Sequence, residues 1–587
     1  MTLTNLDWTI VAVYFLFVLV IGIAVSRKAT SNVTDFFLSG RNMPWWLLGV
    51  SMVATTFSAD TPNLVTGLVR EQGVAGNWAW WAFLITGMLT VFVYAKLWRR
   101  SMVVTDVEFY ELRYSGKAAA FLRGFRALYL GLIFNVLVMG TVSLAAIKFG
   151  EIVLGMPGWL TLLIAGSITI AYSTLGGLKA VIITDFVQFV LAMIGSVWAC
   201  LYILGLPEIG GLDGLLANAD VIAKTSILPD FSDPSIWVPI LIVPLAVQWW
   251  ASYYPGAEPG GGGYIAQRMF SAKDEKNAVG ATLLFNVAHY ALRPWPWILI
   301  ALASLIIFPD LEQISQTFPN LSEDKVGHDV AYPAMLTLLP SGLLGLVAAS
   351  LVAAFMSTMS TQLNLGASYL VNDVYQRFIN PTASQKQLVR AGQGFTVISA
   401  FLGLGLGLVL TDATQAFNLL LLLGAGTGLI YILRWFWWRI NAMTEIVAMI
   451  ASLFVAGYFT FIDHGIEGWK TIMIGALLTT IIWVIATFVT PATDEETLRA
   501  FHQKIKPGGN GWNAVLDRAR SQGVTMEPGE GGLALGVLCM LIGTFTVYAA
   551  LFATGNWIYG NITPALIMTL VSIVGGFFLF KAWDRVS

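Results

Sequence analysis

Oxygen-bearing side chains recur at helical spacing within one long apolar segment, residues 340–372. At positions i, i+3, i+4 and i+7 a helix presents one face, and these positions hold Ser357, Ser360, Thr361 and Asn364. Hydroxyl and carbonyl oxygens are hard ligands, and without a dense carboxylate cluster they favour a monovalent cation over calcium. Small hydroxyl residues also line helix–helix seams. The pattern therefore indicates either a cation site or a packing contact.

A second polar stretch, from Ser51 to Pro62, interrupts the apolar run 45–69. A proline removes one helical hydrogen bond, and irregular backbone at membrane depth is tolerated where it lines a water- or ion-filled site. The simpler alternative is a kinked helix whose hydroxyls bond back to its own carbonyls. Asp185, in the later run 178–205, supplies a formal negative charge that could join the face of Ser357.

Arg293 stands near the middle of the apolar run 278–308, beside two prolines. An arginine at that depth either binds an anionic ligand or pairs with a buried acid such as Asp60 or Glu258. Aromatic side chains could stack on a cyclic ligand, although many of the 22 tryptophans must belong to the interfacial belts. The aromatic candidates are Trp78, Trp80, Trp81, Trp249, Trp250, Tyr253 and Tyr254.

The composition places these residues in a membrane. Of 587 residues, 57% are hydrophobic and 11% are charged, with a mean hydropathy of +0.73. A spanning helix needs about 20 apolar residues, and fifteen runs are long enough, which predicts an all-α integral membrane protein. The runs are 8–26, 45–69, 76–98, 124–154, 158–177, 178–205, 236–256, 278–308, 340–372, 386–410, 413–437, 443–462, 469–490, 532–554 and 562–580.

The distribution of lysine and arginine predicts the orientation, because positive charge accumulates on cytoplasmic loops. With the N-terminus outside, Lys148 and Arg293 fall within spans and four basic residues fall on outer loops. All the other lysines and arginines, among them Arg268, fall on inner loops. The sequence therefore predicts an external N-terminus and a cytoplasmic C-terminus in a plasma membrane such as a bacterial inner membrane. The four basic residues on outer loops are Arg70, Lys224, Lys325 and Lys470.

Several function classes are disfavoured. A net charge of −2 without a basic tract argues against nucleic-acid partners. Cys200 and Cys539 lie in apolar runs, the four histidines are scattered, and neither HExxH nor GxSxG occurs, so we expect no enzyme. A channel would need pore-lining repeats or a carbonyl filter, which the sequence lacks. The remaining classes are a solute transporter and a receptor that binds a solute without transporting it. We expect membrane lipid as a partner and find no sign of an obligatory protein partner.

Five motifs make the chain resemble the sodium:solute symporter family, a branch of the LeuT-type transporters. They are Asp35–Arg41, Ser51–Asp60, Gly176–Asp185, Tyr264–Arg268 and Ala354–Thr358, and the resemblance covers roughly 7–440. It implies a single transmembrane domain, 1–587, with a 5+5 inverted-repeat core around a midplane site. The implied parts are repeat one at 45–205, repeat two at 236–437, an extra helix at 8–26, and peripheral helices at 443–587 with a cytoplasmic loop at 491–531. The broken helices would be 45–69 and 236–256, the second ending in the glycine-rich stretch 254–263.

The same resemblance implies a sodium site made by carbonyls of the first core helix and by a carbonyl and hydroxyls of the eighth. The matching residues are Ala54, Phe57, Ala354, Ser357 and Thr358. Some members bind a second sodium ion, and its equivalent positions are Asp185, Ser360 and Thr361, with Ser357 shared. The resemblance thus predicts secondary active import of a small polar solute with sodium, with two ions expected per cycle.

The solute itself is less constrained. Sugar-transporting members carry a lysine where this chain has Tyr290, and often Glu-Gln where it has Asp60-Thr61, so these positions argue against a typical hexose site. Arg293 favours an anionic solute, a carboxylate or an acidic sugar; a neutral sugar, a polyol or an amino acid is the alternative. The predicted solute-binding residues are Thr56, Asp60, Trp80, Trp249, Tyr290 and Arg293.

Overall fold

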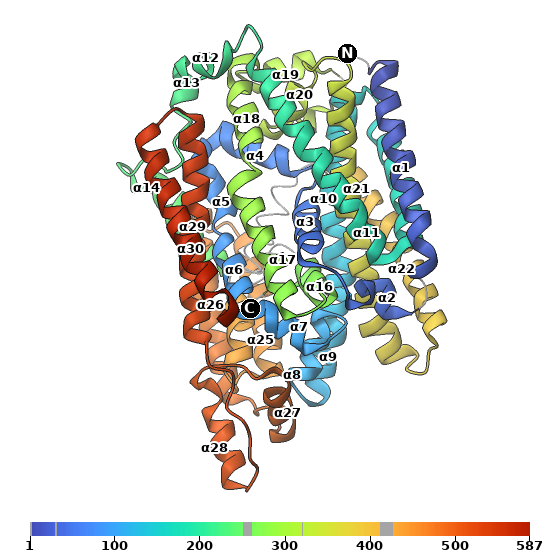
Figure 1. Ribbon diagram of the computed structural model, residues 1–587, viewed down its shortest axis with the longest axis vertical. Coiled ribbons are helices and arrows are strands. Elements are labelled where there is room, and N and C mark those ends of the chain that lie inside the picture. Colours follow the sequence, from blue (N-terminus) through green and yellow to red (C-terminus); the bar gives the residue numbers. More distant parts are fainter. Residues whose placement is uncertain (1–2, 30–31, 251–260, 320, 411–426, 587) are drawn as a thin grey trace.

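The computed structural model describes residues 3–29, 32–250, 261–319, 321–410 and 427–586, and these residues form a helical bundle (Figure 1). Within these ranges the structure contains no β-strand, and one isolated bridge joins Met43 to Ala272. Ten helical segments of the described residues are long and apolar enough to cross a membrane, and some of them, such as Val74–Ser101, consist of several consecutive helices. The prediction of an all-α membrane protein is therefore confirmed.

The helices agree with the predicted runs. Besides the ten long helices there are four shorter apolar ones, and each of these helices overlaps one predicted run. The remaining run, 413–437, lies largely outside the described residues, so the number of crossings stays a prediction. The principal helices are α1 (Asn5–Ala29), α2 (Val33–Leu38), α3 (Trp45–Thr56), α4 (Thr61–Gln72), α5 (Trp78–Trp81), α6 (Leu84–Leu89), α7 (Ala95–Ser101), α9 (Gly116–Leu128), α10 (Asn135–Phe149), α11 (Gly158–Leu204), α16 (Gly263–Ser271), α17 (Glu275–Val287), α18 (Trp295–Ile307), α21 (Leu343–Tyr369), α22 (Gln385–Val409), α24 (Gly428–Phe436), α25 (Ala442–Phe461), α26 (Gly468–Val489), α29 (Leu533–Ile558) and α30 (Ile562–Val586).

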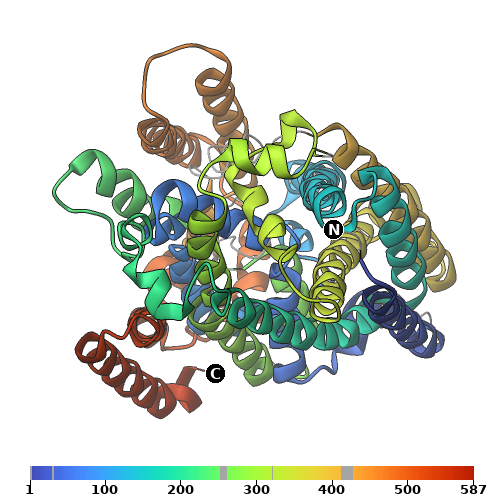
Figure 2. The same cartoon turned by 90° about the horizontal axis from the view of Figure 1, so that it is seen from above.

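Short helices cover the two ends of the bundle. At the end drawn at the top of Figure 1 lie α12 (Gly211–Ala217), α13 (Ala219–Ile222) and α19 (Leu311–Thr317), and at the other end lie α8 (Phe109–Arg113), α27 (Glu495–Ile505) and α28 (Asn513–Ser521). We call these ends the α12 face and the α27 face. Seen from above, α1 and the α29–α30 pair lie at opposite edges of the bundle (Figure 2).

The run 45–69 is broken at its centre. Helix α3 ends at Thr56, α4 begins at Thr61, and Pro62 stands in the first turn of α4. A proline has no N–H and is favoured at the start of a helix, so it supports a new helix here rather than a continuous one. The backbone from Phe57 to Asp60 is consequently non-helical.

A glycine sets the position of Asp185. Gly177 has φ +55° and ψ −166° and breaks α11 where the sequence predicts one run to end and the next to begin. A Cβ atom at this residue would lie 2.7 Å from the carbonyl oxygen of Phe36, so both the positive φ and the close approach require glycine. Asp185 follows two turns later and faces α3 and α21.

The other core helices are also irregular near the centre. Between α17 and α18 lies the π-helical turn η9 (Ala288–Leu292), followed by Arg293. Pro294 and Pro296 cannot donate backbone hydrogen bonds, which accounts for the local change of helix type, and such turns are frequent at functional sites. On the other predicted broken helix, the 3₁₀ turn η8 (Gln248–Trp250) precedes the gap and α16 follows it, while 251–260 lie outside the described residues.

Candidate ion site and solute site

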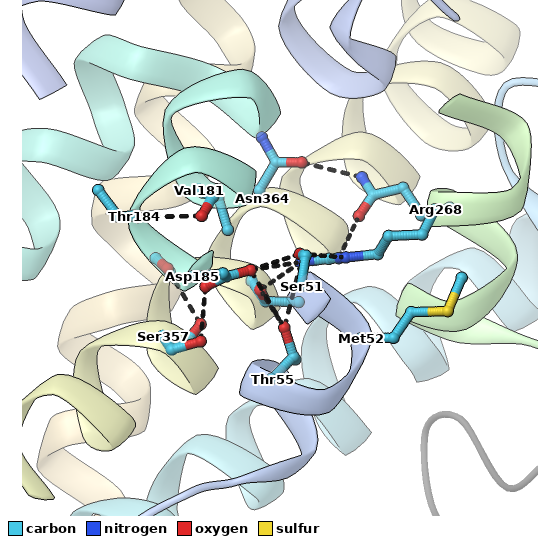
Figure 3. A network of polar contacts seen from close by, with 12 residues as sticks. Ser51, Met52, Thr55, Val181, Thr184, Asp185, Arg268, Ser357 and Asn364 are labelled. Atoms are coloured by element: carbon cyan, nitrogen blue, oxygen red, sulfur yellow. Dashed lines mark hydrogen bonds and ion pairs between the residues drawn. The ribbon is translucent and has the colours of Figure 1, made fainter. Parts of the chain in front are cut away.

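A buried carboxylate lies at the centre of a polar cluster between α3, α11, α16 and α21 (Figure 3). Asp185 Oδ2 accepts a hydrogen bond from Ser51 Oγ at 2.5 Å, and Asp185 Oδ1 accepts one from Ser357 Oγ at 2.6 Å. All three residues are fully buried. The structure thus brings together Asp185 and Ser357, which the sequence placed on different helices.

The other hydroxyls of the α21 face differ in their contacts. Thr361 Oγ1 lies 3.2 Å from Thr55 Oγ1 and points into the cluster. Ser360 instead donates to the carbonyl of Ser357, within its own helix, at 3.0 Å. One turn further along, Asn364 Oδ1 accepts from Gln267 Nε2 at 2.9 Å. The predicted face therefore exists, but Ser360 donates within its own helix and not to Asp185.

Arg268 is the residue of this cluster that the sequence reasoning missed. The assignment of Arg268 to an inner loop is wrong, because its side chain is fully buried and lies 3.4 Å from Asp185 Oδ2. Its guanidinium also donates to Thr361 Oγ1 at 2.8 Å, to Thr55 Oγ1 at 3.2 Å and to Ser51 Oγ at 3.1 Å. Helix α16, which begins at Gly263, places Arg268 against α3, α11 and α21. A basic residue soon after a glycine-rich break in a predicted span was the available signal.

The residues predicted for the first sodium site lie where α3 and α21 meet. Thr358 Oγ1 donates to the carbonyl of Thr55 at 3.0 Å, beside Ala54 and at the point where the helical hydrogen bonds of α3 end. Ala54, Phe57, Ala354, Ser357 and Thr358 are all at most 2% exposed. Among the described residues no three His, Cys, Asp or Glu side chains gather. Hydroxyls, carbonyls and one carboxylate suit a hard monovalent cation.

Arg293 binds the broken backbone of the first core helix. It donates to the carbonyl of Val53 at 3.1 Å, and to Thr56 Oγ1 and the Thr56 carbonyl at 3.3 Å each. The guanidinium carbon lies 5.2 Å from the ring centre of Trp297 and 5.8 Å from that of Phe57. The Val53 carbonyl also accepts from the Phe57 N–H at 3.0 Å, whereas the Thr56 carbonyl lies beyond the helical hydrogen bonds of α3, so at Thr56 the guanidinium binds a group that the helix end leaves without a helical partner.

The two predicted acid partners of Arg293 have different outcomes. Asp60 accepts a hydrogen bond from the hydroxyl of Ser58, and the positive charge of Arg293 attracts the Asp60 carboxylate. Glu258 lies outside the described residues.

The predicted aromatic residues form a wall next to Arg293. Trp80 stacks on Tyr290 with ring centres 5.8 Å apart and an angle of 24°, and His289 meets Trp80 edge-on at 5.4 Å. Trp249 lies in η8, 5.5 Å from Trp250, and this turn is tied to the helix of Trp80 by a hydrogen bond from Gln248 to the Ala79 carbonyl at 2.8 Å. Tyr253 and Tyr254 lie outside the described residues.

Comparison with known proteins agrees with these features. The model of the Sodium:solute symporter family matches residues 36–453. The sodium/glucose cotransporter of Vibrio parahaemolyticus is 26% identical over 514 residues, which cover 84% of this chain and 92% of that protein. Sodium/glucose cotransporter 4 of Danio rerio is 27% identical over 493 residues, 77% of this chain and 71% of the relative.

A solved structure has the same fold. A Na⁺-coupled sialic acid symporter, substrate-bound and outward-open, superposes with a TM-score of 0.64 at 18% identity, covering 84% of this chain and all but 1% of that one. The family match extends over well more than half of the chain and includes every helix of the two polar regions. The protein is therefore a multi-pass membrane transporter with a LeuT-type fold, coupled to sodium, and not an enzyme. The chain belongs to the sodium:solute symporter family.

Proposed function

We propose that this transporter imports a small polar organic solute together with two sodium ions by alternating access. The observation that carries the proposal is that two separate buried polar regions meet the same broken helix, the Asp185 cluster at α3 and the Arg293 wall at the α3–α4 break. An ion drives such a cycle only by binding one conformation more tightly than the other. Two sites on a helix that is interrupted at its centre are suited to such conformation-dependent binding, because a hinge motion at the interruption would change the geometry of both sites at once.

We place the first sodium ion at Ala54, Phe57, Ala354, Ser357 and Thr358. In support, α3 ends at Thr56, and the C-terminal end of a helix carries partial negative charge on its carbonyls. The hydroxyl of Thr358 already occupies the hydrogen-bonding position beside that end. A sodium ion there would exchange water for carbonyl and hydroxyl oxygens.

We place the second sodium ion at Asp185, Ser360 and Thr361, with Ser357 shared. The formal charge of Asp185 supports this site, as do the hydroxyls of α21 that face the carboxylate. Arg268 now contacts the same oxygens, which makes this second site depend on the position of α16.

We infer that the solute lies between the α3–α4 break and the Trp80–Tyr290 wall, contacting Thr56, Asp60, Trp249 and Arg293. An aromatic wall beside a guanidinium suits a ring that carries a carboxylate, because the ring stacks while the charge meets Arg293. An acidic sugar or a related carboxylate is therefore the favoured class. The second candidate is a neutral sugar, which the stacked pair and the names of the two sodium/glucose cotransporters support.

We also propose the orientation with the α27 face in the cytoplasm and the α12 face outside, in the plasma membrane. Asp7 accepts backbone hydrogen bonds from Gly342 and Gly345 at the start of α21, whereas Asp584 pairs with Lys276 at the start of α17. The N-terminus lies at the α12 face in Figure 1, and Glu275, next to Lys276, binds Arg100, which also donates to the Ile505 carbonyl of α27. An odd number of crossings would place the two ends on opposite faces in this way. The inverted repeats 45–205 and 236–437 would then surround the two polar regions, with 8–26 and 443–587 outside them.

Thermal unfolding of the purified protein across a panel of sugars, sugar acids and carboxylates tests the function, in sodium chloride and in matched potassium chloride. A ligand that binds the native state raises the unfolding temperature by mass action. We expect a sugar acid or carboxylate to stabilise the protein in sodium only. Stabilisation by a neutral sugar alone would overturn the anionic preference, and stabilisation that is equal in both salts would overturn sodium-coupled binding.

A further inference from the structure

Arg268 contacts the oxygens that the second sodium ion would need. Its Nη2 atom lies 2.8 Å from Thr361 Oγ1, 3.2 Å from Thr55 Oγ1 and 3.4 Å from Asp185 Oδ2. Its Nε atom donates to Ser51 Oγ at 3.1 Å. A guanidinium and a sodium ion cannot both occupy the space beside this carboxylate oxygen.

The charge balance of the site also argues against simultaneous binding of sodium and the guanidinium beside Asp185. Asp185 and Arg268 are fully buried, and together they form a neutral pair. A buried charge without a counter-charge is strongly disfavoured. A sodium ion added beside the guanidinium would leave an excess positive charge in a site closed to water, whereas a sodium ion that replaced the guanidinium would preserve neutrality.

Helix α16 carries the guanidinium and is held to its neighbours by further hydrogen bonds. Next to Arg268, Gln267 Nε2 donates to Asn364 Oδ1 of α21 at 2.9 Å and to the carbonyl of Phe37 at 3.1 Å. The N–H of Gly263, at the start of α16, donates to Asp106 at 2.9 Å. A movement of α16 away from α21 would break the Gln267–Asn364 contact and withdraw Arg268 from the cluster in the same step.

We propose that Arg268 is a built-in cation that occupies the second sodium site in this conformation and leaves Asp185 when α16 moves, so that sodium and the guanidinium alternate there during transport. This inference rests on the proposed second sodium site. It makes the sodium affinity of that site depend on the conformation, which is the condition for ion coupling. Arg268 is thus a positioning residue for coupling rather than a contact of the solute.

The test is sodium binding by the full-length purified protein, measured with ²²Na⁺ in Arg268→Gln. Removing the guanidinium leaves Asp185 open to sodium, so we expect the second ion to bind at least about tenfold more tightly than in the wild type. Sodium chloride should also raise the unfolding temperature of this variant more than matched potassium chloride does, and by more than in the wild type. Unchanged or weaker sodium binding would overturn the exchange.

The matched control is Arg123→Gln, which removes the partner of another buried carboxylate, Asp373, 2.6 Å away and remote from the cluster. This variant should show the wild-type response to sodium, and a gain equal to that of Arg268→Gln would overturn a site-specific exchange. If Arg268→Gln does not fold in either salt, Arg268→Lys keeps the charge but makes fewer contacts. It should bind sodium more tightly than the wild type by a smaller factor, and equal or weaker binding would again contradict the proposal.

Asp185→Asn separates this inference from the proposed function. If that variant still binds two sodium ions, the second site is wrong and the exchange falls with it. If it binds one ion while neither Arg268 variant gains affinity, the second site stands and only the exchange is overturned.

Discussion

Two buried arginines of the core, Arg268 and Arg293, reach the same broken helix but contact different groups. Arg268 lies beside a carboxylate and hydroxyls of the Asp185 cluster, whereas Arg293 donates to the carbonyls of Val53 and Thr56 and lies over two aromatic rings. The first arrangement is a buried ion pair, and the proposal requires a sodium ion to replace the guanidinium there. The second keeps a positive centre next to an aromatic wall, which suits a ligand with an electron-rich group. In our proposal, one residue type thus acts in ion coupling in one region and in solute binding in the other.

The largest difference between the regions should appear when charges are removed. Asp185→Asn leaves Arg268 buried without its counter-charge, and breaking a buried pair in this way costs about 3 to 5 kcal/mol. We therefore expect a large fall in unfolding temperature, and recovery of at least half of it in Asp185→Asn/Arg268→Gln, measured at one scan rate. Losses that simply add in the double variant would show that the two groups are not coupled as a pair.

A change at Arg293 should act on the solute instead. Arg293→Lys keeps the charge but loses the planar fork, so we expect KM for the solute found in the panel to rise about tenfold or more, with expression nearly unchanged. The same substitution should leave the number of bound sodium ions as in the wild type. Collapse of the purified variant would instead give Arg293 a structural role, as a clamp on the end of α3.

The fold was largely predictable, because hydropathy and glycine or proline breaks are properties of single segments. The predicted boundary at 177/178 falls on Gly177, and the polar stretch 51–62 contains the break between α3 and α4. The residues alone indicated that Asp185 could join the Ser357 face, and the family resemblance placed both residues in one sodium site. The location of Arg268 was not, because loop assignment from charge treats every basic residue beyond an apolar run as solvated. Contacts such as Trp80 with Tyr290 join distant helices, and periodicity within one helix contains no information about them.

The hydroxyl groups of the ion region should differ in how much each contributes to sodium affinity. Ser357 donates directly to Asp185 and is shared by both proposed ion sites, so Ser357→Ala should weaken sodium binding about tenfold. Ser360 donates within its own helix, so Ser360→Ala should weaken sodium binding less, about threefold. ²²Na⁺ titration of both variants measures the contrast. Normal affinity in Ser357→Ala would remove α21 from the ion sites.

The smallest expected change belongs to the solute region. Trp80→Phe retains an aromatic face against Tyr290 but loses ring area and the hydrogen bond to Asn77, so KM should rise only about two- to fivefold. Sodium affinity measured without solute should not change. A shift in sodium affinity as large as that of Ser357→Ala would mean that the two regions are not separate.

Direct counting of bound sodium tests the central claim, that the Asp185 cluster holds a second coupling ion apart from the solute region. Equilibrium binding of ²²Na⁺ to the purified protein needs no solute, and Asp185→Asn/Arg268→Gln provides a variant without the buried charges. The account predicts two ions per wild-type protein and one in the double variant. One ion in both proteins, or two in both, would contradict it.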